Sequence, residues 1–114
     1  MALIFKIVTA QDWAAALTEG LFIGAGVDLA DGFIHFSTRE QVEETAAKHF
    51  HGAASLLLLG VEEEKLGKKL VYEISRGGAL FPHLYGPLPT ALARFTWPLP
   101  LGADGAPDFS GIFA

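Results

Sequence analysis

Hydrophobic and polar positions along this chain follow two patterns. Short apolar runs recur through its length, and two segments between them place apolar residues three and four positions apart. Apolar runs of about four to eight residues are typical of buried strands, whereas the wider spacing is typical of one helix face. The pattern predicts strands at 3–8, 33–36, 54–61, 70–75 and 92–97, and helices at about 10–19 and 39–50.

Both predicted helices carry signals at their ends. Thr9 is followed three residues later by an aspartate, which is a capping pattern, and Gly20 suits the end of the first helix because glycine adopts left-handed backbone angles without strain. Ser37 and Thr38 are alternative caps for the second helix, since each is followed three residues later by Glu or Gln. On the first helix, Leu17 is expected on the buried face.

Glycine and proline mark the remaining segments as loops. Residues 20–31, with two closely spaced glycines and two aspartates, are predicted to be a connecting loop. Residues 81–89 contain three prolines and are predicted to be an extended, stiff loop. Helices occur in the first half of the chain and strands continue through the second, which is typical of α+β proteins rather than doubly wound sheets. We therefore predict a single α+β domain over residues 1–114.

Composition narrows the partner and the compartment. The chain has no cysteine, and its formal net charge is −5, from 13 acidic and 8 basic residues. Binding to nucleic acid needs clustered Lys and Arg, and the one dense basic cluster, at 65–69, adjoins three glutamates. No apolar run approaches the roughly 20 residues of a membrane span. We expect a cytoplasmic protein with a small-molecule ligand, and neither nucleic acid nor a membrane as partner.

His35 is the leading candidate for chemistry. It interrupts the apolar run at 33–36, directly after an acidic turn that contains Asp28 and Asp31. Because side chains alternate along a strand, Phe33 and His35 are expected on one face and their two neighbours on the other. A titratable ring near a strand end is a candidate for acid–base work, so we assign His35 a predicted catalytic role.

The residues that follow His35 predict a place for an anion. Ser37 and Thr38 precede the second predicted helix, and the free N–H groups of a helix start favour negative charge. Arg39 adds a cation at the same position in the sequence. We therefore predict that Ser37, Thr38 and Arg39 bind an anionic group of the ligand.

A second cluster of candidate residues lies later in the chain. His83 and Tyr85 alternate within the proline-rich segment 81–89, where a stiff backbone suits the wall of a site. Glu73, on the preceding predicted strand, is a candidate base if it points into the same cleft as His35. If His35 and His83 converge, the sequence predicts one cleft between them.

Other interpretations of the same residues remain open. His35, His83 and a carboxylate such as Asp31 or Glu73 are enough in principle for a metal site. The two histidines are equally compatible with core positions whose ring nitrogens are hydrogen-bonded. A binding module without catalysis would use the same convergent polar groups.

Several motifs occur together over nearly the whole chain. They are Phe5-Lys6-Ile7, Trp13-x-x-Ala16-x-x-x-Gly20, Asp31-Gly32-Phe33-Ile34-His35-Phe36-Ser37-Thr38, Gln41, Glu73 and Phe81-Pro82-His83-Leu84-Tyr85-Gly86. In this combination the chain, to about Asp104, resembles the bacterial domain-of-unknown-function 952 family. That family has no established activity, so the resemblance supplies no reaction.

A more distant resemblance implies a ligand class. The family is similar in fold to the ADP-ribosyltransferase group, and the segment at 34–37 resembles the His-Val-His-Leu-Ser stretch of RNA 2′-phosphotransferases, with Gly20-Leu21 also matching. The resemblance implies a split antiparallel or mixed sheet, and a cleft at His35 that binds NAD or an ADP-ribosylated nucleotide. Phe33 replaces the first histidine of that stretch, and the preceding arginine is missing. Since arginines grip phosphates bidentately, this departure argues against RNA 2′-phosphate transfer.

The sequence thus predicts an α+β domain of the ADP-ribosyltransferase-like type that binds a nucleotide-like ligand, of the NAD or ADP-ribose type. The alternatives are a non-enzymatic small-ligand binding module and a His–carboxylate metal site. Whether the chain catalyses a reaction stays open at this point. The predicted residues are His35 and Glu73 for catalysis, and Ser37, Thr38, Arg39, His83 and Tyr85 for ligand binding.

Overall fold

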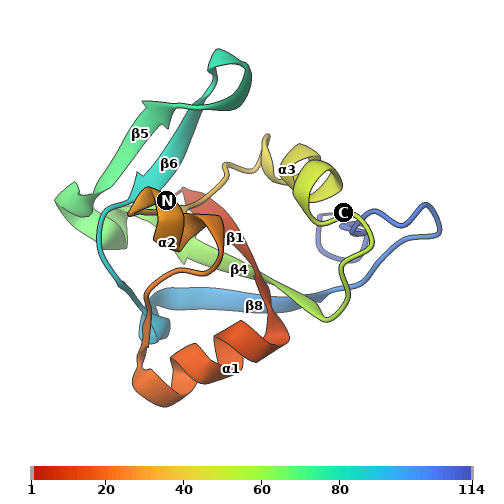
Figure 1. Cartoon of the computed structure of the whole chain (residues 1–114), viewed down its shortest axis with the longest axis horizontal. Coiled ribbons are helices and arrows are strands. Elements are labelled where there is room, and N and C mark those ends of the chain that lie inside the picture. The colour runs from red at the N-terminus through yellow and green to blue at the C-terminus, as the bar shows by residue number, and fades with distance from the viewer. Residues whose placement is uncertain (1, 114) are drawn as a thin grey trace.

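Antiparallel sheets with helices packed against them make up the architecture of the computed structural model, which describes residues 2–113 (Figure 1). The mixture of helices and antiparallel strands confirms the α+β class. Within these residues no helix is long and apolar enough to cross a membrane. In chain order the elements are β1 (Leu3–Thr9), α1 (Ala10–Glu19), β2 (Leu21–Phe22), α2 (Val27–Asp31), β3 (Ile34–His35), α3 (Val42–His49), β4 (Leu56–Glu62), β5 (Leu70–Ile74), β6 (Leu80–Leu84), β7 (Leu88–Pro89) and β8 (Ala93–Leu99), with 3₁₀ segments at Glu63–Lys69, Arg76–Gly78 and Thr90–Leu92.

Two three-stranded sheets meet at one point. In the first sheet β4 lies between β1 and β8, and in the second β6 lies between β3 and β5. A short β2–β7 pair completes the strands, and all pairings are antiparallel. Phe5 and Ser37 exchange two backbone hydrogen bonds of 2.8 Å, which join β1 to the chain just beyond β3. The split in the sheet therefore opens beside His35.

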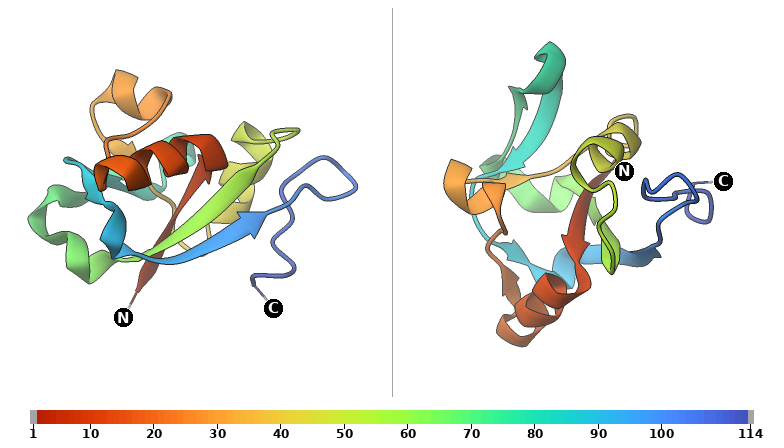
Figure 2. Two further views of the ribbon diagram at one scale, coloured as in Figure 1. Left: turned by 90° about the horizontal axis from the view of Figure 1, so that it is seen from below. Right: turned by 45° about the vertical axis from the view of Figure 1, so that its right-hand side comes forward.

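The central strand β4 separates two hydrophobic clusters. Leu58 and Leu59 are both 0% exposed although they are neighbours, so they face opposite sides of the sheet. Leu59 packs in a cluster with residues of α1 and the second sheet, and Leu58 packs in a cluster with residues of α3 and the C-terminal segment. The views in Figure 2 show α1 and α3 on different sides of the β1–β4–β8 sheet. The apolar run predicted to be a doubly buried strand is confirmed.

Helix α1 has the boundaries that the sequence predicts. The Thr9 hydroxyl accepts a hydrogen bond of 3.0 Å from the Asp12 N–H, and Gly20 ends the helix at φ 79°. Trp13 and Ala16 are buried, as expected for the apolar face. The prediction for Leu17 is wrong, because its side chain is 57% exposed and the stripe that packs on the sheet is narrower than the sequence pattern.

Replacing Thr9 with alanine should lower the free energy of unfolding by about 1 kcal/mol, since an N-cap oxygen is lost. Thr18→Ala is the matched control, because the Thr18 hydroxyl donates to the Ala14 carbonyl within the same helix and caps no free N–H. The control should stay within about 0.5 kcal/mol of wild type. Urea unfolding of both variants measures the difference, and equal effects would show that the cap does not hold the helix start.

Two predicted loops need correction. The loop predicted at 20–31 contains β2 and the short helix α2, which has too few residues to show a helical repeat and lies between Gly26 and Gly32, both at positive φ. The predicted loop at 81–89 contains β6 and β7 instead. Pro82 is tolerated within β6 because it lies opposite Phe36, one residue beyond β3, and still accepts its N–H at 2.9 Å.

The second predicted helix begins later than expected. The sequence predicts a start near Arg39, whereas α3 runs from Val42 to His49. The Thr38 N–H donates to the Gln41 side chain at 3.0 Å, so one half of the predicted Thr38–Gln41 cap is present. The residues between Thr38 and Val42 form turns, and the Val42 N–H donates to the Thr38 carbonyl at 3.0 Å where the helical bonding begins.

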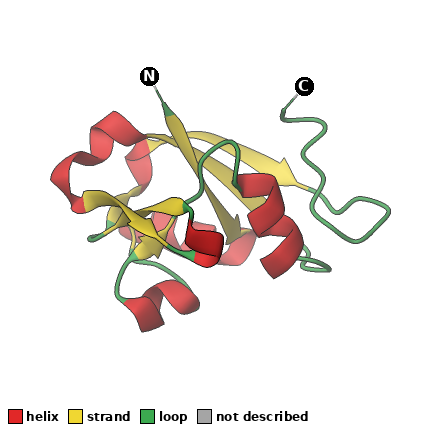
Figure 3. Cartoon of the chain, turned by 90° about the horizontal axis from the view of Figure 1, so that it is seen from above, coloured by secondary structure: helices red, strands yellow, loops and turns green. Residues whose placement is uncertain are grey.

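The C-terminal segment packs on its own chain. It is drawn as loop throughout after β8 (Figure 3), yet Phe109 is buried against the face of the first sheet that carries α3. The Phe113 ring meets Phe5 edge to face at 5.3 Å, and the Arg39 guanidinium lies 3.7 Å from the centroid of the same ring. Apolar burial therefore holds a segment that has no regular hydrogen bonding.

Candidate functional site

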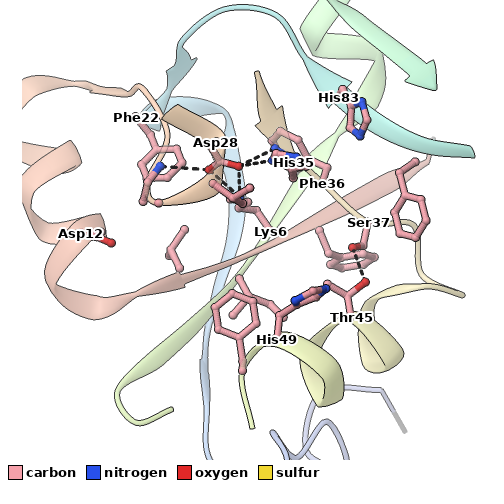
Figure 4. Close-up of a pocket in the computed structure, with 18 of the residues that line it drawn as sticks. Lys6, Asp12, Phe22, Asp28, His35, Phe36, Ser37, Thr45, His49 and His83 are labelled. Atoms are coloured by element: carbon pink, nitrogen blue, oxygen red, sulfur yellow. Dashed lines mark hydrogen bonds and ion pairs between the residues drawn. The ribbon is translucent and has the colours of Figure 1, made fainter. Parts of the chain in front are cut away.

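A groove of about 540 Å³ opens where the two sheets separate. Strand β1 contributes to it, together with residues of α2, β3, α3 and β6. Figure 4 shows Lys6, Asp28 and His35 joined by dashed lines, with His83 beyond His35 and with Thr45 and His49 on the α3 side. Its volume is in the range of about 300–1,000 Å³ that is usual for small-molecule sites. The groove is therefore the candidate functional site.

The two histidines meet because their strands pair in register. His35 on β3 is directly opposite His83 on β6, and directly opposite residues share a face of the sheet. Their ring centroids are 5.3 Å apart. The predicted convergence of these two side chains is what the pairing produces, and both line the groove.

Asp28 is the buried centre of a polar network. Asp28 is 2% exposed, and its carboxylate lies 2.8 Å from Lys6 Nζ and 2.6 Å from His35 Nδ1. The backbone N–H groups of Ala25 and His35 also donate to it, at 3.1 and 3.0 Å. The short helix α2 is thus anchored to β1 and β3 through a single side chain. Gly24 is required beside it, because a Cβ there would lie 2.8 Å from the Asp28 Cβ.

Burial and pairing act in opposite directions on the charges of this network. Burial lowers the pKa of Lys6, and the nearby Asp28 carboxylate only partly offsets this. Burial alone would raise the pKa of Asp28, but the charge of Lys6 and the hydrogen bonds from Lys6 and His35 outweigh it and hold that pKa below 3.8. Asp28 is therefore an ionised, fully bonded acceptor at neutral pH.

Both ring nitrogens of His35 face carboxylates. Nδ1 lies 2.6 Å from Asp28 Oδ1, and Nε2 lies 3.0 Å from Asp31 Oδ2. An ionised carboxylate only accepts hydrogen bonds, so both contacts are satisfied together when both nitrogens carry a proton. The Asp31 side chain is 43% exposed, whereas that of Asp28 is closed off from solvent. The arrangement makes His35 a hydrogen-bond donor on the groove wall.

His83 is held by a different carboxylate. Its Nδ1 lies 2.8 Å from Glu73 Oε1, which also accepts a 2.7 Å hydrogen bond from the Tyr85 hydroxyl. The hydrogen bonds from Tyr85 and then His83 lower the pKa of Glu73, and the same bond to Glu73 raises the pKa of Tyr85. Because Glu73 is an ionised acceptor, the proton of a neutral His83 resides on Nδ1.

The other nitrogen of His83 has no partner in the part of the chain that the structure describes. His83 is 4% exposed, and its Nε2 is a buried polar atom without a hydrogen bond among the residues that the structure describes. Buried polar atoms are nearly always bonded, so an orphan of this kind points to a ligand or a bound water. This atom belongs to a residue that lines the groove.

An aromatic cluster fixes the ring planes around the histidines. The Phe33 ring stacks on His83 at 4.1 Å between centroids, and it lies 4.6 Å from His35 and 5.1 Å from Tyr85. Phe33 and His35 share one face of their segment, as the alternation predicts, while Ile34 is buried on the opposite face. The packing leaves the imidazoles little freedom to rotate.

Arg39 of the predicted anion site lies apart from the two histidines, and the anion-binding roles of Ser37 and Thr38 stay predictions. The Ser37 N–H donates to the Phe5 carbonyl and the Thr38 N–H to Gln41, so neither is available. Arg39 lies 3.5 Å from Glu43 and stacks over Phe113, on the side of the C-terminal segment. The expected convergence of Arg39 with the two histidines is thus wrong, because α3 starts several residues later than predicted. Ser37 lines the groove, with its hydroxyl 3.3 Å from that of Thr45.

Two residues of the site were not singled out as functional from the sequence. Lys6 is the one polar side chain in the otherwise apolar run at 3–8, and a lysine buried in a strand needs a carboxylate partner. That signal was available, but it could not identify Asp28 over any other acid. Asp28 was noticed only as part of an acidic turn, since a five-residue helix leaves no periodic pattern.

No metal cluster accompanies the histidines in the part of the chain that the structure describes. Within residues 2–113, no group of three or more His, Asp or Glu side chains is arranged to hold an ion. The Nδ1 atoms of His35 and His83 each face their own carboxylate instead of a common point.

The fold and the groove define a small α+β protein with two carboxylate-bound histidines at the split of its sheet. The chain belongs to the family described as "Protein of unknown function (DUF952)", whose model matches residues 7–93. The description names no activity.

Solved structures of a relative support the fold. The X-ray structure of protein CC0527 from Caulobacter crescentus is 53% identical, covers 96% of each chain and superposes with a TM-score of 0.93. The solution NMR structure of CC0527 is 53% identical over 100% of this chain and 98% of that chain, with a TM-score of 0.90. Among curated proteins, none matches the chain.

Proposed function

We propose that the groove binds a nucleotide-like small molecule, of the NAD or ADP-ribose type, through a hydroxyl group of its ribose. The observation that carries the proposal is the Nε2 of His83, which is buried on the groove wall and has no hydrogen-bond partner among the described residues. With the proton on Nδ1, this nitrogen is an acceptor and needs a donor from the ligand. A ribose hydroxyl supplies such a donor.

The rest of the groove suits an aromatic base. Phe22, Phe36 and Phe81 line it, and aromatic side chains provide flat apolar surface for stacking. Thr9 and Ser37 add hydroxyl groups at separate points along the same wall. A mostly apolar pocket with few polar groups is the usual design of small-molecule sites.

Charge favours the nucleoside part of such a ligand at the histidines, with the phosphates toward solvent. Asp28 already neutralises Lys6, and Asp12, Asp31 and Glu73 add further negative charge around the groove. Among the described residues that line it, none is an arginine. Phosphates placed beside His83 would therefore lack the bidentate partners that usually hold them. The proposed site recognises the base and the ribose of the ligand, which adenosine and NAD share.

Binding tests should therefore separate ribose from phosphate and base. Protein-observed NMR and thermal shift are run with adenine, adenosine, ADP-ribose, NAD and Zn²⁺ on wild type and His83→Phe. Adenosine or a compound that contains it should bind wild type and lose at least about tenfold in affinity in His83→Phe, since phenylalanine keeps the ring and removes the acceptor. A ligand at about 100 times its Kd adds about 2.7 kcal/mol to stability, which thermal shift registers, while NMR reports the binding directly.

The control is His51→Gln, because His51 contacts the Asp104 carbonyl in the C-terminal segment, away from His83. It should bind the ligands as wild type does. Equal binding of adenine and adenosine, or equal affinity in wild type and His83→Phe, would contradict the ribose contact. Stabilisation by Zn²⁺ alone, lost in His83→Phe, would favour the metal-site alternative.

A further inference from the structure

We propose that the groove is a hydrolase site, in which His83 acts as general base on a water molecule that attacks a carboxylic ester of a hydroxylated, nucleoside-like substrate. The proposal rests on the proposed function, since the same groove holds the substrate, and in the reacting complex the attacking water replaces the ribose hydroxyl as the donor to His83 Nε2. The hydrolase proposal adds a reaction and assigns a residue to each step of that reaction. Glu73 is a positioning residue, and His35 is the donor to the developing oxyanion.

His83 has the geometry of a general base whose ring is oriented by a carboxylate bound to its other nitrogen. Glu73 Oε1 accepts its Nδ1–H at 2.8 Å, and the Tyr85 hydroxyl fixes that carboxylate at 2.7 Å. Phe33 stacks on the ring with an interplanar angle of 27°, so the ring plane is set as well. Within residues 2–113 the lone pair of Nε2 is then the one unbonded polar site of the ring, and His83 is 4% exposed. A carboxylate–histidine pair of this kind generates a base for water or for a substrate hydroxyl.

No protein nucleophile is required beside it. The chain has no cysteine, and the Ser37 hydroxyl lies against Thr45 at 3.3 Å instead of against either histidine. Water is therefore the nucleophile that the arrangement supports.

His35 supplies the hydrogen-bond donor, whereas His83 supplies the base. The ring centroids of the two residues are 5.3 Å apart. Asp28 holds its Nδ1 at 2.6 Å and keeps it protonated, while Nε2 donates to Asp31 at 3.0 Å. Asp31 is 43% exposed on its side chain, so it can turn to solvent when a carbonyl oxygen takes its place. A positioned hydrogen-bond donor is worth most where negative charge develops during the reaction.

The charges around the groove select a neutral reacting group. Lys6 is paired with Asp28, and the carboxylates of Asp31 and Glu73 each contact one of the two histidines. A phosphodiester would carry its own negative charge into this surrounding before any bond changes, whereas a carboxylic ester acquires charge only in the transition state. Interactions that appear only in the transition state are those that accelerate a reaction.

The atoms of the reaction balance with water alone. As the water oxygen bonds to the ester carbon, its proton passes to His83 Nε2, and the carbonyl electron pair moves to the oxygen beside His35. When that pair re-forms the carbonyl, the bond between carbon and the ester oxygen breaks, and the His83 proton passes to the leaving alkoxide. The products are a carboxylic acid and the free hydroxyl compound.

The test uses two neutral esters, p-nitrophenyl acetate and 5′-O-acetyladenosine, and the phosphodiester bis(p-nitrophenyl) phosphate. Wild type should cleave the acetyl esters above the spontaneous rate, with a preference for the adenosine ester in kcat/KM. His83→Gln should lose about 100- to 10,000-fold in kcat, the usual contribution of a general base. Glu73→Gln should lose about 10- to 100-fold in kcat with KM nearly unchanged, because a carboxylate behind the histidine orients the ring without touching substrate. His51→Gln should be as active as wild type.

A second readout is independent of turnover. Long-range ¹H–¹⁵N spectra of the imidazoles should show the Nδ1–H tautomer of His83 in wild type and a mixture of tautomers in Glu73→Gln. Folding of each variant is checked by thermal unfolding, and Glu73→Gln is a mild change because that side chain is 38% exposed.

Each experimental outcome tests a different part of the proposal. Acetyladenosine that binds by NMR without being cleaved overturns the hydrolase inference and leaves the proposed function standing. Absence of both binding and cleavage overturns both. Cleavage that is equal in wild type and His83→Gln overturns the role of His83, and His83-dependent cleavage of the phosphodiester in place of the esters overturns the substrate class.

Discussion

Replacing Asp28 with alanine should lower the free energy of unfolding by about 3–5 kcal/mol, the usual cost of removing one partner of a buried ion pair. The substitution would leave Lys6 Nζ, whose side chain is 11% exposed, without its carboxylate. It would also leave the N–H groups of Ala25 and His35 without the acceptor that both use. A buried donor or charge without a partner costs more than the pair itself contributes. Chemical unfolding at neutral pH measures the loss.

The matched control for this substitution is Asp31→Ala. Asp31 contacts the same histidine from the exposed side, and exposed ion pairs contribute less than about 1 kcal/mol. The double variant Lys6→Met, Asp28→Ala should be less destabilised than the sum of its single substitutions, because neither charge is then left alone. Strict additivity, or equal effects of the two aspartate substitutions, would contradict the assignment of Asp28 as the anchor of α2.

The same residue connects stability to acid pH. The pKa of Asp28 is lower in the folded protein than its ordinary 3.8, since Lys6 and His35 outweigh the opposing effect of burial. A depressed pKa contributes stability above the unfolded value and loses it as pH falls through the folded value. The stability gap between wild type and Asp28→Ala should therefore narrow below pH 3.8. Unfolding curves between neutral pH and pH 2 test this expectation, and a gap of constant size would contradict it.

The second large effect is expected in β4. Leu58→Ala and Leu59→Ala should each lower the free energy of unfolding by about 2–5 kcal/mol, because each leaves a cavity in one of the two hydrophobic clusters. Adjacent residues of a strand with one exposed face would behave differently, with only one of the two substitutions costly. Both are costly here because both side chains are 0% exposed.

Leu17→Ala is the control for these core substitutions. It removes the same atoms from a side chain that is 57% exposed, and it should change stability by less than about 0.5 kcal/mol. Urea unfolding of the three variants gives the comparison. A small effect at either Leu58 or Leu59 would show that one face of β4 is not covered by a packed hydrophobic cluster.

Strands β1, β3, β4, β5 and β8 and helix α1 were predictable because their patterns depend on neighbours in sequence. Thr9 and Gly20 end α1 through local hydrogen bonding and local backbone angles. The continuous apolar run near Leu58 could only be a strand buried on both faces. In contrast, α2 was missed because it is stabilised by the contacts of Asp28 with Lys6 and His35, which are distant in sequence.

The candidate site divides in the same way. Alternation along the chain placed Phe33 and His35 on one face, and the density of polar and aromatic residues singled out His83 and Tyr85. The prediction that Arg39 lies beside the two histidines was wrong, since the turns before α3 carry its side chain to Phe113. Those turns depend on where the backbone of Ser37 pairs with β1.

By itself the sequence determined the α+β class, the doubly buried central strand, the boundaries of α1 and the two histidines as candidates for chemistry. Apolar spacing and capping residues act over a few positions, so they can be read directly from the chain. Only the tertiary structure decided that His35 and His83 are cross-strand neighbours, that Lys6 and Asp28 pair beneath them and that His83 Nε2 is left unbonded among the described residues. These depend on strand register and on side chains brought together across the fold, which no local pattern specifies.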